Sequence, residues 1–124
     1  MYLLDTHILL WYLHDDDRLS DKTKTIISDN DISISIASLW EIAIKKGLGK
    51  LKIYETVSDL EKVCNEQDIE IIPIKTKYLE VIQTLPYIHN DPFDRLIIAT
   101  ASTDGMTLIT DDKKIKNYSI SQIS

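Results

Sequence analysis

Short apolar segments typical of β-strands alternate with segments of helical spacing along the whole chain, and this alternation limits the possible folds more than any other feature. Residues 2–5 form the first apolar segment, and apolar and small residues alternate along residues 32–38, as in a strand. Further segments of strand type lie at residues 69–74, 106–110 and 118–123. Strands separated by helices favour a parallel sheet with helices on both faces. We therefore expect an α/β fold, a three-layer α/β/α sandwich with a mainly parallel central sheet.

Residue types that begin and end helices flank several of the intervening segments. Ser38 and Glu41 have the spacing of a capping box, and Gly47 is expected just beyond the end of that helix. Asp91 is expected at an N-cap, followed by a proline at the first helical position, with Gly105 after the last turn. The predicted helices span residues 6–15, 20–30, 38–47, 56–68, 76–85, 91–105 and, as a short helix, 111–117.

The length of 124 residues fits a single domain, residues 1–124, with one hydrophobic core. The only cysteine, Cys64, permits no disulfide within the chain, and the N-terminal apolar run contains Asp5 instead of the basic start of a signal peptide. No stretch approaches the ~18 apolar residues of a membrane span. We therefore expect a cytoplasmic protein. Its net charge of −6 disfavours a general DNA-coating protein, unless a cation cancels the charge locally.

Acidic residues fall where a parallel sheet forms its ligand sites, outside the carboxyl ends of the strands. Asp5 closes the first strand, Glu41 is expected in the first turn after the second, and Asp112 follows the strand at 106–110. Asp94 opens a helix that is expected to start at the same edge. Taken singly, an acid in a first helical turn is explained by the helix dipole, worth about 0.3–1 kcal/mol. Asp5 fits this explanation least, since an enclosed, unpaired carboxylate costs several kcal/mol.

Four carboxylates at one edge of a sheet would repel one another. A pair ~4 Å apart costs about 4 kcal/mol at an effective dielectric constant of ~20. The cluster stays ionised only if strong positive charge lies within it, and ligands that are all oxygens select Mg²⁺ or Mn²⁺. Sites of this kind commonly serve phosphodiester hydrolysis, in which the metal activates water and neutralises the scissile phosphate.

Beyond the acids, four ordered blocks extend over nearly the whole chain. They are LLDTHILLW at 3–11, ISIASLWEIAIKKGLGKL at 34–51, LPYIHNDPFDRLIIATA at 85–101 and LITDD at 108–112. With these blocks the sequence resembles the PIN-domain ribonucleases, in particular the VapC-type toxins of type II toxin–antitoxin pairs. The resemblance implies a PIN-like α/β/α fold, Mg²⁺- or Mn²⁺-dependent endoribonuclease activity, inhibition by a cognate antitoxin protein, and a homodimer.

The resemblance also assigns the acids to positions of the family pattern. Asp5, Glu41 and Asp94 match the first, second and third acids. Asp112 matches the fourth, because the family pattern reads Thr-any-Asp and Thr110 matches its threonine. On this basis the four acids form the catalytic set. The aspartates among them hold the metal, and the glutamate orients the attacking water.

Supporting roles are predicted for residues beside the acids. Asp111 occupies the variable position next to Asp112 and ranks second as a ligand. Asp91 is expected mainly as an N-cap. Arg95 has two open interpretations, contact with a phosphate or a salt bridge to the acids. Thr6 follows the first acid, where its hydroxyl either orients water or ligand or caps the helix.

Basic and imidazole side chains near these blocks have alternative explanations. Lys45, Lys46 and Lys50 belong to the densest basic cluster. A solvated face explains them by default, and contact with the RNA backbone is the sharper alternative. His7 follows the first acid closely enough for a supporting role. His89 precedes the DPFDR block, where it either contacts substrate or shapes the loop.

Other functional classes compete with the ribonuclease interpretation. A phosphatase or receiver domain would need a further acid beside Asp5, where the sequence reads DTH. A catalytically silent module that binds RNA or protein would be favoured by the loss of an acid, and all four are present. A structure-specific DNA nuclease shares the acids, but 124 residues leave little room for the insertions that grip a duplex.

Overall fold

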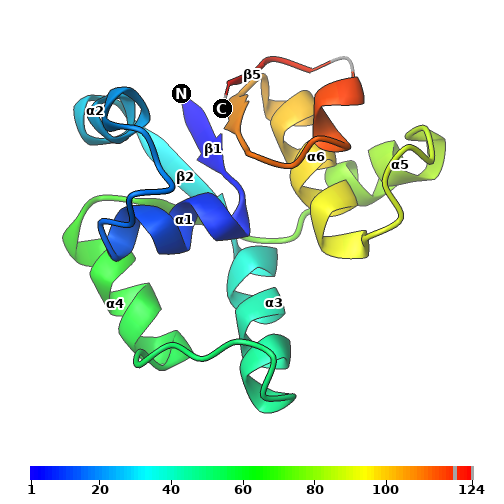
Figure 1. Ribbon diagram of the computed structural model, residues 1–124. Coiled ribbons are helices and arrows are strands. Elements are labelled where there is room, and N and C mark those ends of the chain that lie inside the picture. Colours follow the sequence, from blue (N-terminus) through cyan, green and yellow to red (C-terminus); the bar gives the residue numbers. More distant parts are fainter. Residues whose placement is uncertain (119, 124) are drawn as a thin grey trace.

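The computed structural model describes residues 1–118 and 120–123 (Figure 1). Its elements are β1 (Tyr2–Leu4), α1 (Thr6–Leu13), α2 (Asp21–Asp29), β2 (Ile32–Ser35), α3 (Ile36–Gly47), α4 (Val57–Glu66), β3 (Glu70–Ile72), α5 (Thr76–Thr84), α6 (Pro92–Asp104), β4 (Thr107–Ile109), the 3₁₀ helix η1 (Ile115–Asn117) and β5 (Gln122–Ile123). The five strands form one sheet in the order β3-β2-β1-β4-β5, with every neighbouring pair parallel. None of the described helices is long and apolar enough to cross a membrane.

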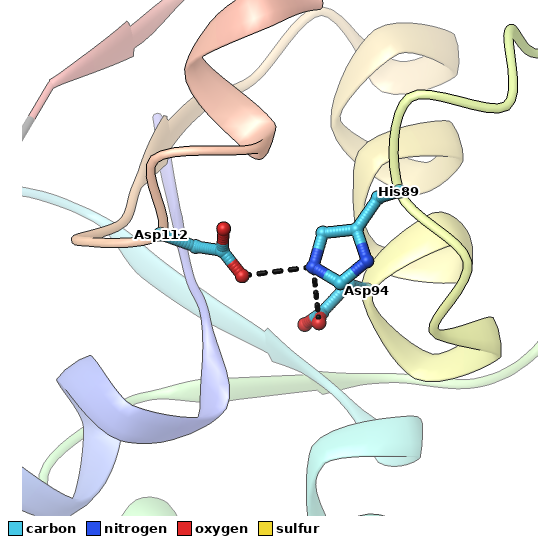
Figure 2. Close-up of side chains that lie close together, drawn as sticks. All are labelled: His89, Asp94 and Asp112. Atoms are coloured by element: carbon cyan, nitrogen blue, oxygen red, sulfur yellow. Dashed lines mark hydrogen bonds and ion pairs between the residues drawn. The ribbon is translucent and has the colours of Figure 1, made fainter.

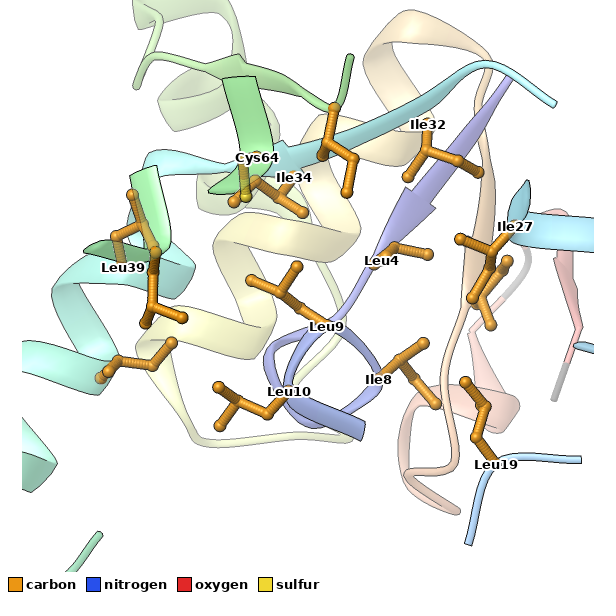
Figure 3. Close-up of a cluster of buried hydrophobic side chains, with 14 residues drawn as sticks. Leu4, Ile8, Leu9, Leu10, Leu19, Ile27, Ile32, Ile34, Leu39 and Cys64 are labelled. Carbon is orange, nitrogen blue, oxygen red and sulfur yellow. The ribbon is translucent and has the colours of Figure 1, made fainter. Parts of the chain in front are cut away.

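Helices cover both faces of the sheet, and successive residues of the central strands point into two separate hydrophobic clusters. Leu4 and Ile109 belong to the cluster formed with α1, α2 and α4, which also buries Cys64 (Figure 3). Leu3 and Leu108 belong to the cluster formed with α5 and α6. Helix α3 supplies buried residues to both clusters. The predicted three-layer α/β/α sandwich is therefore confirmed, with an entirely parallel sheet.

The boundary between β2 and α3 lies earlier in the chain than predicted. The strand predicted over 32–38 ends at Ser35, whose side chain accepts a hydrogen bond from the Ala37 N–H at 3.0 Å and caps α3. The predicted capping box of Ser38 and Glu41 is therefore wrong, because both residues lie inside the helix. The alternating pattern continues past the end of the strand. The strand itself ends at Ser35 because β2 can pair only as far as the short strands beside it extend, and the helix starts where this pairing ends.

Two helix ends show how far local signals carry. At α6, Asp91 is the N-cap and Gly105 adopts the left-handed conformation after the last turn, as predicted. At α3, Gly47 is the last helical residue, and Gly49 takes the left-handed backbone with φ 70°. The prediction of a stop beyond the helix at Gly47 is thus wrong, because the chain continues for a further turn before it reverses.

The C-terminal segment is less regular than predicted. The short helix expected over 111–117 is reduced to η1, because the Asp112 side chain accepts the Lys114 N–H at 2.8 Å and forms a local turn instead. The strand expected over 118–123 is reduced to β5, and its residue 119 lies outside the described residues.

The strand order creates a topological switch point at the carboxyl ends of β1 and β4. The chain runs from β1 to its neighbour β2 on one side, while β4 lies on the other side of β1. Leu4 pairs in register with Ile109. The next residue, Asp5, donates its backbone N–H to the Ile109 carbonyl at 3.1 Å. Open parallel sheets bind ligands at such points, so the segments after β1 and β4 frame the candidate site.

Candidate active site

An open pocket lies at this switch point and brings together the four acids that the sequence predicts. Each comes from a different part of the fold: the end of β1, helix α3, the first turn of α6, and the segment after β4. The residues lining the pocket are Asp5, Thr6, His7, Trp11, Glu41, Lys45, Asp91, Asp94, Asp111 and Asp112. The expectation that these acids converge at one edge of the sheet is confirmed.

Asp5 is the most enclosed of the aspartates, with only 6% of its surface exposed. Its Oδ1 accepts the Ile8 N–H at 3.0 Å, which caps α1, and its Oδ2 accepts the hydroxyl of Thr110. Burial raises the pKa of Asp5 above its ordinary value of 3.8, although these hydrogen bonds oppose the shift. Within residues 1–118 and 120–123, Asp5 forms no ion pair. Hydrogen-bond donors therefore fix the orientation of the Asp5 carboxylate, but no ion pair among the described residues neutralises its charge.

His89 lies between two of the other acids (Figure 2). Its Nε2 is 2.8 Å from Asp112 Oδ2 and 3.0 Å from Asp94 Oδ2. One oxygen of each carboxylate and one ring nitrogen all lie within 4.8 Å of one another. The residues reach this cluster from three segments: the loop before α6, the first turn of α6, and the segment after β4.

The two acids beside His89 differ in their protonation equilibria. Burial, followed by the negative charge of neighbouring acids, raises the pKa of Asp94 from 3.8 to about 7, against the opposing effect of His89. Burial also acts to raise the pKa of Asp112, but hydrogen bonds from His89 and from the Lys114 N–H outweigh it and leave that pKa below its ordinary value. Asp94 is therefore the acid whose negative charge is least compensated.

Glu41 is buried on α3 and is held on both of its oxygens. Its Oε1 accepts the Thr6 hydroxyl at 2.7 Å, and its Oε2 lies 2.6 Å from Lys45 Nζ, one helical turn further along. The Thr6 hydroxyl also lies 3.0 Å from the Ser38 hydroxyl. The sequence predicts Glu41 in the first turn of its helix, but α3 starts earlier than predicted. Glu41 therefore projects into the pocket from the second turn of α3. Thr6 orients this carboxylate.

Thr110, Asp91 and Asp111 differ in how far they take part in the cluster. The Thr110 hydroxyl donates to Asp5 and accepts the Asp112 N–H at 3.0 Å, so it joins two of the acids. Asp91 caps α6 by accepting the N–H groups of Phe93 at 2.8 Å and Asp94 at 3.1 Å. Asp111 is exposed at the rim of the pocket.

Proteins with known descriptions are similar to this chain in sequence. The profile of the PIN domain matches residues 2–120. This chain belongs to the PIN domain family. Ribonuclease VapC22 of Mycobacterium tuberculosis is 26% identical to this PIN domain over 119 residues, which cover 94% of this chain and 90% of the relative.

Solved structures share the fold of this PIN domain over nearly its full length. VapBC2 from Rickettsia felis, solved with a DNA fragment from its promoter, matches with a TM-score of 0.72 at 22% identity, covering 98% of this chain and 96% of that chain. FitAcB from Neisseria gonorrhoeae matches with a TM-score of 0.69 at 16% identity, covering 100% of this chain and 97% of that chain.

Arg95 of this PIN domain takes neither of its two predicted roles. It is buried in α6, and its guanidinium donates to backbone carbonyls of the preceding segment, at 3.0 Å to Pro86 and 3.1 Å to Ile82, with further bonds to Leu85 and His89. None of the ion pairs in the described chain involves Arg95. The guanidinium of Arg95 holds the loop before α6, because several backbone carbonyls of the preceding segment point toward it.

The predicted basic cluster divides into separate roles. Lys45 lines the acid pocket, and its hydrogen bond to Glu41 raises its pKa above the ordinary value. Lys46 points away to the backbone, where it donates to the carbonyl of Ile53 at 3.1 Å and to that of Glu55. Lys50 is exposed beyond the end of α3. Of these lysines, Lys45 is the one placed to contact a ligand in the pocket.

The donor chemistry of the pocket fits a hard divalent cation. Its acids offer carboxylate oxygens, which Mg²⁺ and Mn²⁺ prefer. Burial, followed by the charge of neighbouring acids, raises the pKa of Asp94 to about 7, so its ionised form would be stabilised by a nearby cation. Lys45, the one lysine in the pocket lining, is engaged by Glu41. The pattern of acids could be predicted from sequence, whereas His89 could be recognised only as the residue two positions before the N-cap of α6.

Proposed function

We propose that this PIN domain is a Mg²⁺- or Mn²⁺-dependent endoribonuclease and the toxin of a toxin–antitoxin pair. The observation that carries the proposal is the convergence of four acids at the switch point of a parallel sheet, with Asp5 buried and without an ion pair among the described residues. The similarity to Ribonuclease VapC22 supports RNA as the substrate.

In this proposal Asp5, Asp94 and Asp112 hold the cation. When bound, it supplies activation of water and neutralisation of the scissile phosphate. The Ile8 N–H and the Thr110 hydroxyl fix the orientation of Asp5, so that its oxygens are placed before a ligand arrives. Preorganised groups of this kind stabilise a charged transition state without reorganising during the reaction.

Glu41 and Lys45 have different roles at the wall of the pocket. The carboxylate of Glu41, held by Thr6, accepts a hydrogen bond from the attacking water and directs it toward phosphorus. The side chain of Lys45 is about two-fifths exposed and lies at the same wall, so its ammonium group attracts the phosphate backbone of RNA. Of the lysines predicted to contact RNA, only Lys45 keeps that role in this proposal.

The proposed partners follow from the relatives. The Klebsiella pneumoniae chain that matches this fold with a TM-score of 0.64 comes from a toxin–antitoxin complex, and VapBC2 of Rickettsia felis has a similar fold. We infer that a cognate antitoxin protein binds and inhibits this PIN domain. The homodimer and the cytoplasmic location implied by the sequence stay predictions.

The activity test uses purified protein, freed of any partner, with a pool of small RNAs in the presence of Mg²⁺, Mn²⁺ or EDTA. Asp5→Asn and Asp94→Asn should each lower metal-dependent cleavage by a factor on the order of 10²–10³, as for other groups that stabilise transition-state charge. Asp29→Asn is the matched control, because Asp29 is an exposed aspartate at the end of α2. Its cleavage rate should equal that of the unchanged protein.

Two outcomes would contradict the proposal. Retained metal-dependent cleavage in both Asp5→Asn and Asp94→Asn would place the site elsewhere, and no cleavage by folded protein with either metal would favour a module that only binds. The product ends add a chemical check. Attack by water leaves no cyclic product, whereas a 2′,3′-cyclic phosphate would show that the 2′-hydroxyl of the RNA is the nucleophile and would exclude the proposed mechanism.

A further inference from the structure

The hydrogen bonds of the His89 ring define which nitrogen carries its proton. Nδ1 lies 3.1 Å from the backbone nitrogen of Asp91 and accepts its N–H. A ring nitrogen that accepts a hydrogen bond has no proton of its own, so the proton of the neutral ring is on Nε2. That N–H donates to Asp112 Oδ2 at 2.8 Å, and Asp94 Oδ2 lies 3.0 Å from the same nitrogen (Figure 2). His89 is therefore a donor to Asp112 and a close polar neighbour of Asp94.

The backbone of His89 is held as firmly as its ring. Its N–H donates to the Tyr118 hydroxyl at 2.8 Å, and its carbonyl accepts from Arg95 at 3.3 Å. The same two side chains also hold Pro86, with the Tyr118 hydroxyl donating to its carbonyl at 2.6 Å and Arg95 at 3.0 Å. His89 is 8% exposed. The loop before α6 is thus fixed from both sides, and the ring has little freedom to turn.

This arrangement is the wrong one for a metal ligand. A histidine that ligates a metal through Nε2 donates its Nδ1–H to a carboxylate, carbonyl or water. Here Nδ1 faces the N–H of Asp91, a donor, so moving the ring proton to Nδ1 would set two donors against each other. The cluster of His89, Asp94 and Asp112 has the spacing of a three-ligand metal site, but its hydrogen bonds assign the histidine another role.

We propose that His89 is a positioning residue, which donates its Nε2–H to Asp112 and so holds that carboxylate beside Asp94, around a divalent cation that His89 does not ligate. A carboxylate oxygen has two lone-pair sites, so an oxygen that accepts from His89 keeps capacity for a metal. Without this donor the two carboxylates would repel and separate. The inference rests on the proposed function for the presence of the cation, but the state of the ring is testable without it.

The first experiment measures the tautomer of His89 by ¹⁵N NMR of the histidine rings, with His89→Phe identifying its signals. In EDTA we expect the proton on Nε2. On addition of Mg²⁺ the Nε2–H signals should shift, since Asp112, which accepts from it, and the adjacent Asp94 bind the ion, but the proton should stay on Nε2. A proton on Nδ1 in EDTA, or loss of the Nε2 proton on adding Mg²⁺, would overturn the proposal.

The same spectra separate this inference from the proposed function. If Mg²⁺ shifts no signal of the protein, in the histidine rings or in the backbone amides, the cation and hence the metal-dependent activity are rejected. The tautomer in EDTA still decides whether His89 donates to Asp112. A merely structural His89 would leave its Nε2–H signals insensitive to Mg²⁺ while the protein binds the ion, and this outcome would also overturn the positioning role.

The second experiment measures Mn²⁺ affinity by electron paramagnetic resonance. His89→Phe should weaken binding about 10–100-fold, the range for loss of a partner that orients metal ligands. His89→Gln places an amide N–H near the position of Nε2 and should restore part of that loss. His14→Phe is the control, since His14 is exposed and pairs with Glu55 instead. Unchanged or tighter binding by folded His89→Phe, or no recovery in His89→Gln, would contradict the proposal.

Discussion

Two aspartates in this PIN domain have pKa values that are shifted in opposite directions from the ordinary value of 3.8. In the turn between α1 and α2, Asp16 Oδ2 lies 2.7 Å from Arg18, and hydrogen bonds from the Arg18 side chain and backbone lower the pKa of Asp16 to about 2. In the acid pocket, burial and neighbouring acids raise the pKa of Asp94 to about 7. The chain supplies the partner that ionised Asp16 needs, whereas the pocket concentrates charge that a ligand from outside must neutralise.

Other acids outside the pocket resemble Asp16. Asp59 forms a capping box with Thr56, and those hydrogen bonds lower the pKa of Asp59. At Asp104, burial is outweighed by hydrogen bonds from Lys77 and Tyr78, so its pKa is also lowered. Among the residues that the structure describes, the two carboxylates with raised pKa values are Asp5 and Asp94, and both line the pocket. The contrast teaches that an acidic residue alone does not mark a site. A carboxylate at a sheet edge whose charge no partner in the chain offsets does mark one.

The largest effect is expected at Arg95, the buried cation next to Asp94 in sequence. An ion pair between Arg95 and the pocket acids would remove the contrast between acids with and without a partner in the chain. Arg95→Met removes the donor for several carbonyls before α6, and should lower the free energy of unfolding by about 3–5 kcal/mol. Because Arg95 does not pair with the acids, the pH dependence of stability should keep its shape. Urea unfolding across a pH series measures both.

If Arg95→Met instead removed or inverted the pH dependence, Arg95 would be the counter-charge of the pocket and the contrast would fail. Lys46→Met is the matched control, because Lys46 also donates to backbone carbonyls but lies away from the pocket. It should destabilise the protein less than Arg95→Met, since Lys46 is only partly buried.

A smaller effect is expected from Asp94 itself. Because its folded-state pKa is raised from 3.8 to about 7, the folded protein holds a proton that the unfolded chain releases between these values. Stability in EDTA should therefore fall as pH rises from about 4 to about 7, by about 2 kcal/mol once coupling to neighbouring acids is allowed for. Asp94→Asn should remove this decline and be more stable than the unchanged protein above neutral pH.

Mg²⁺ gives the matching control for Asp94. It should restore stability above neutral pH in the unchanged protein, because it binds the folded state, and should do so less in Asp94→Asn. Thermal unfolding with EDTA and with Mg²⁺ measures the difference. A profile in EDTA that rises with pH over this range would show that the carboxylate of Asp94 is already compensated within the chain.

The sequence predicts the acids of the pocket well because their placement depends on rules that act over short distances. Asp5 directly follows β1, and Asp94 is in the first turn of a helix with clear signals, Asp91 at its start and Gly105 at its end. Adjacent parallel strands then bring their carboxyl ends together without further information. Asp112 joins the cluster for the same reason, since it follows the strand that pairs with β1.

The partners of those acids could not be predicted in the same way. The contact between His89 and Asp112 joins residues 23 positions apart, and the hold on His89 depends on Tyr118, 29 positions away. No periodicity encodes such pairs. Arg95 lies beside the acids in sequence, yet its helix turns it to the carbonyls of the loop before α6. The early start of α3 was hidden because alternating residues continue past Ser35.

The smallest effect is expected at Asp16, and it sharpens the contrast because its sign is opposite to that at Asp94. The folded-state pKa of Asp16 is lowered from 3.8 to about 2, so the ionised pair with Arg18 stabilises the fold above the unfolded-state value and is lost as pH falls between about 4 and about 2. Asp16→Asn should therefore lower the unfolding temperature slightly near neutral pH and not at the acid end of this window. The change is small because ion pairs at the surface are screened by water and salt. Asparagine keeps the oxygen that accepts the Arg18 N–H at 2.9 Å, so the substitution tests the charge and not the turn. Thermal unfolding at low and high salt measures it, and a destabilisation that grows as pH falls would show that Asp16, like Asp94, is uncompensated.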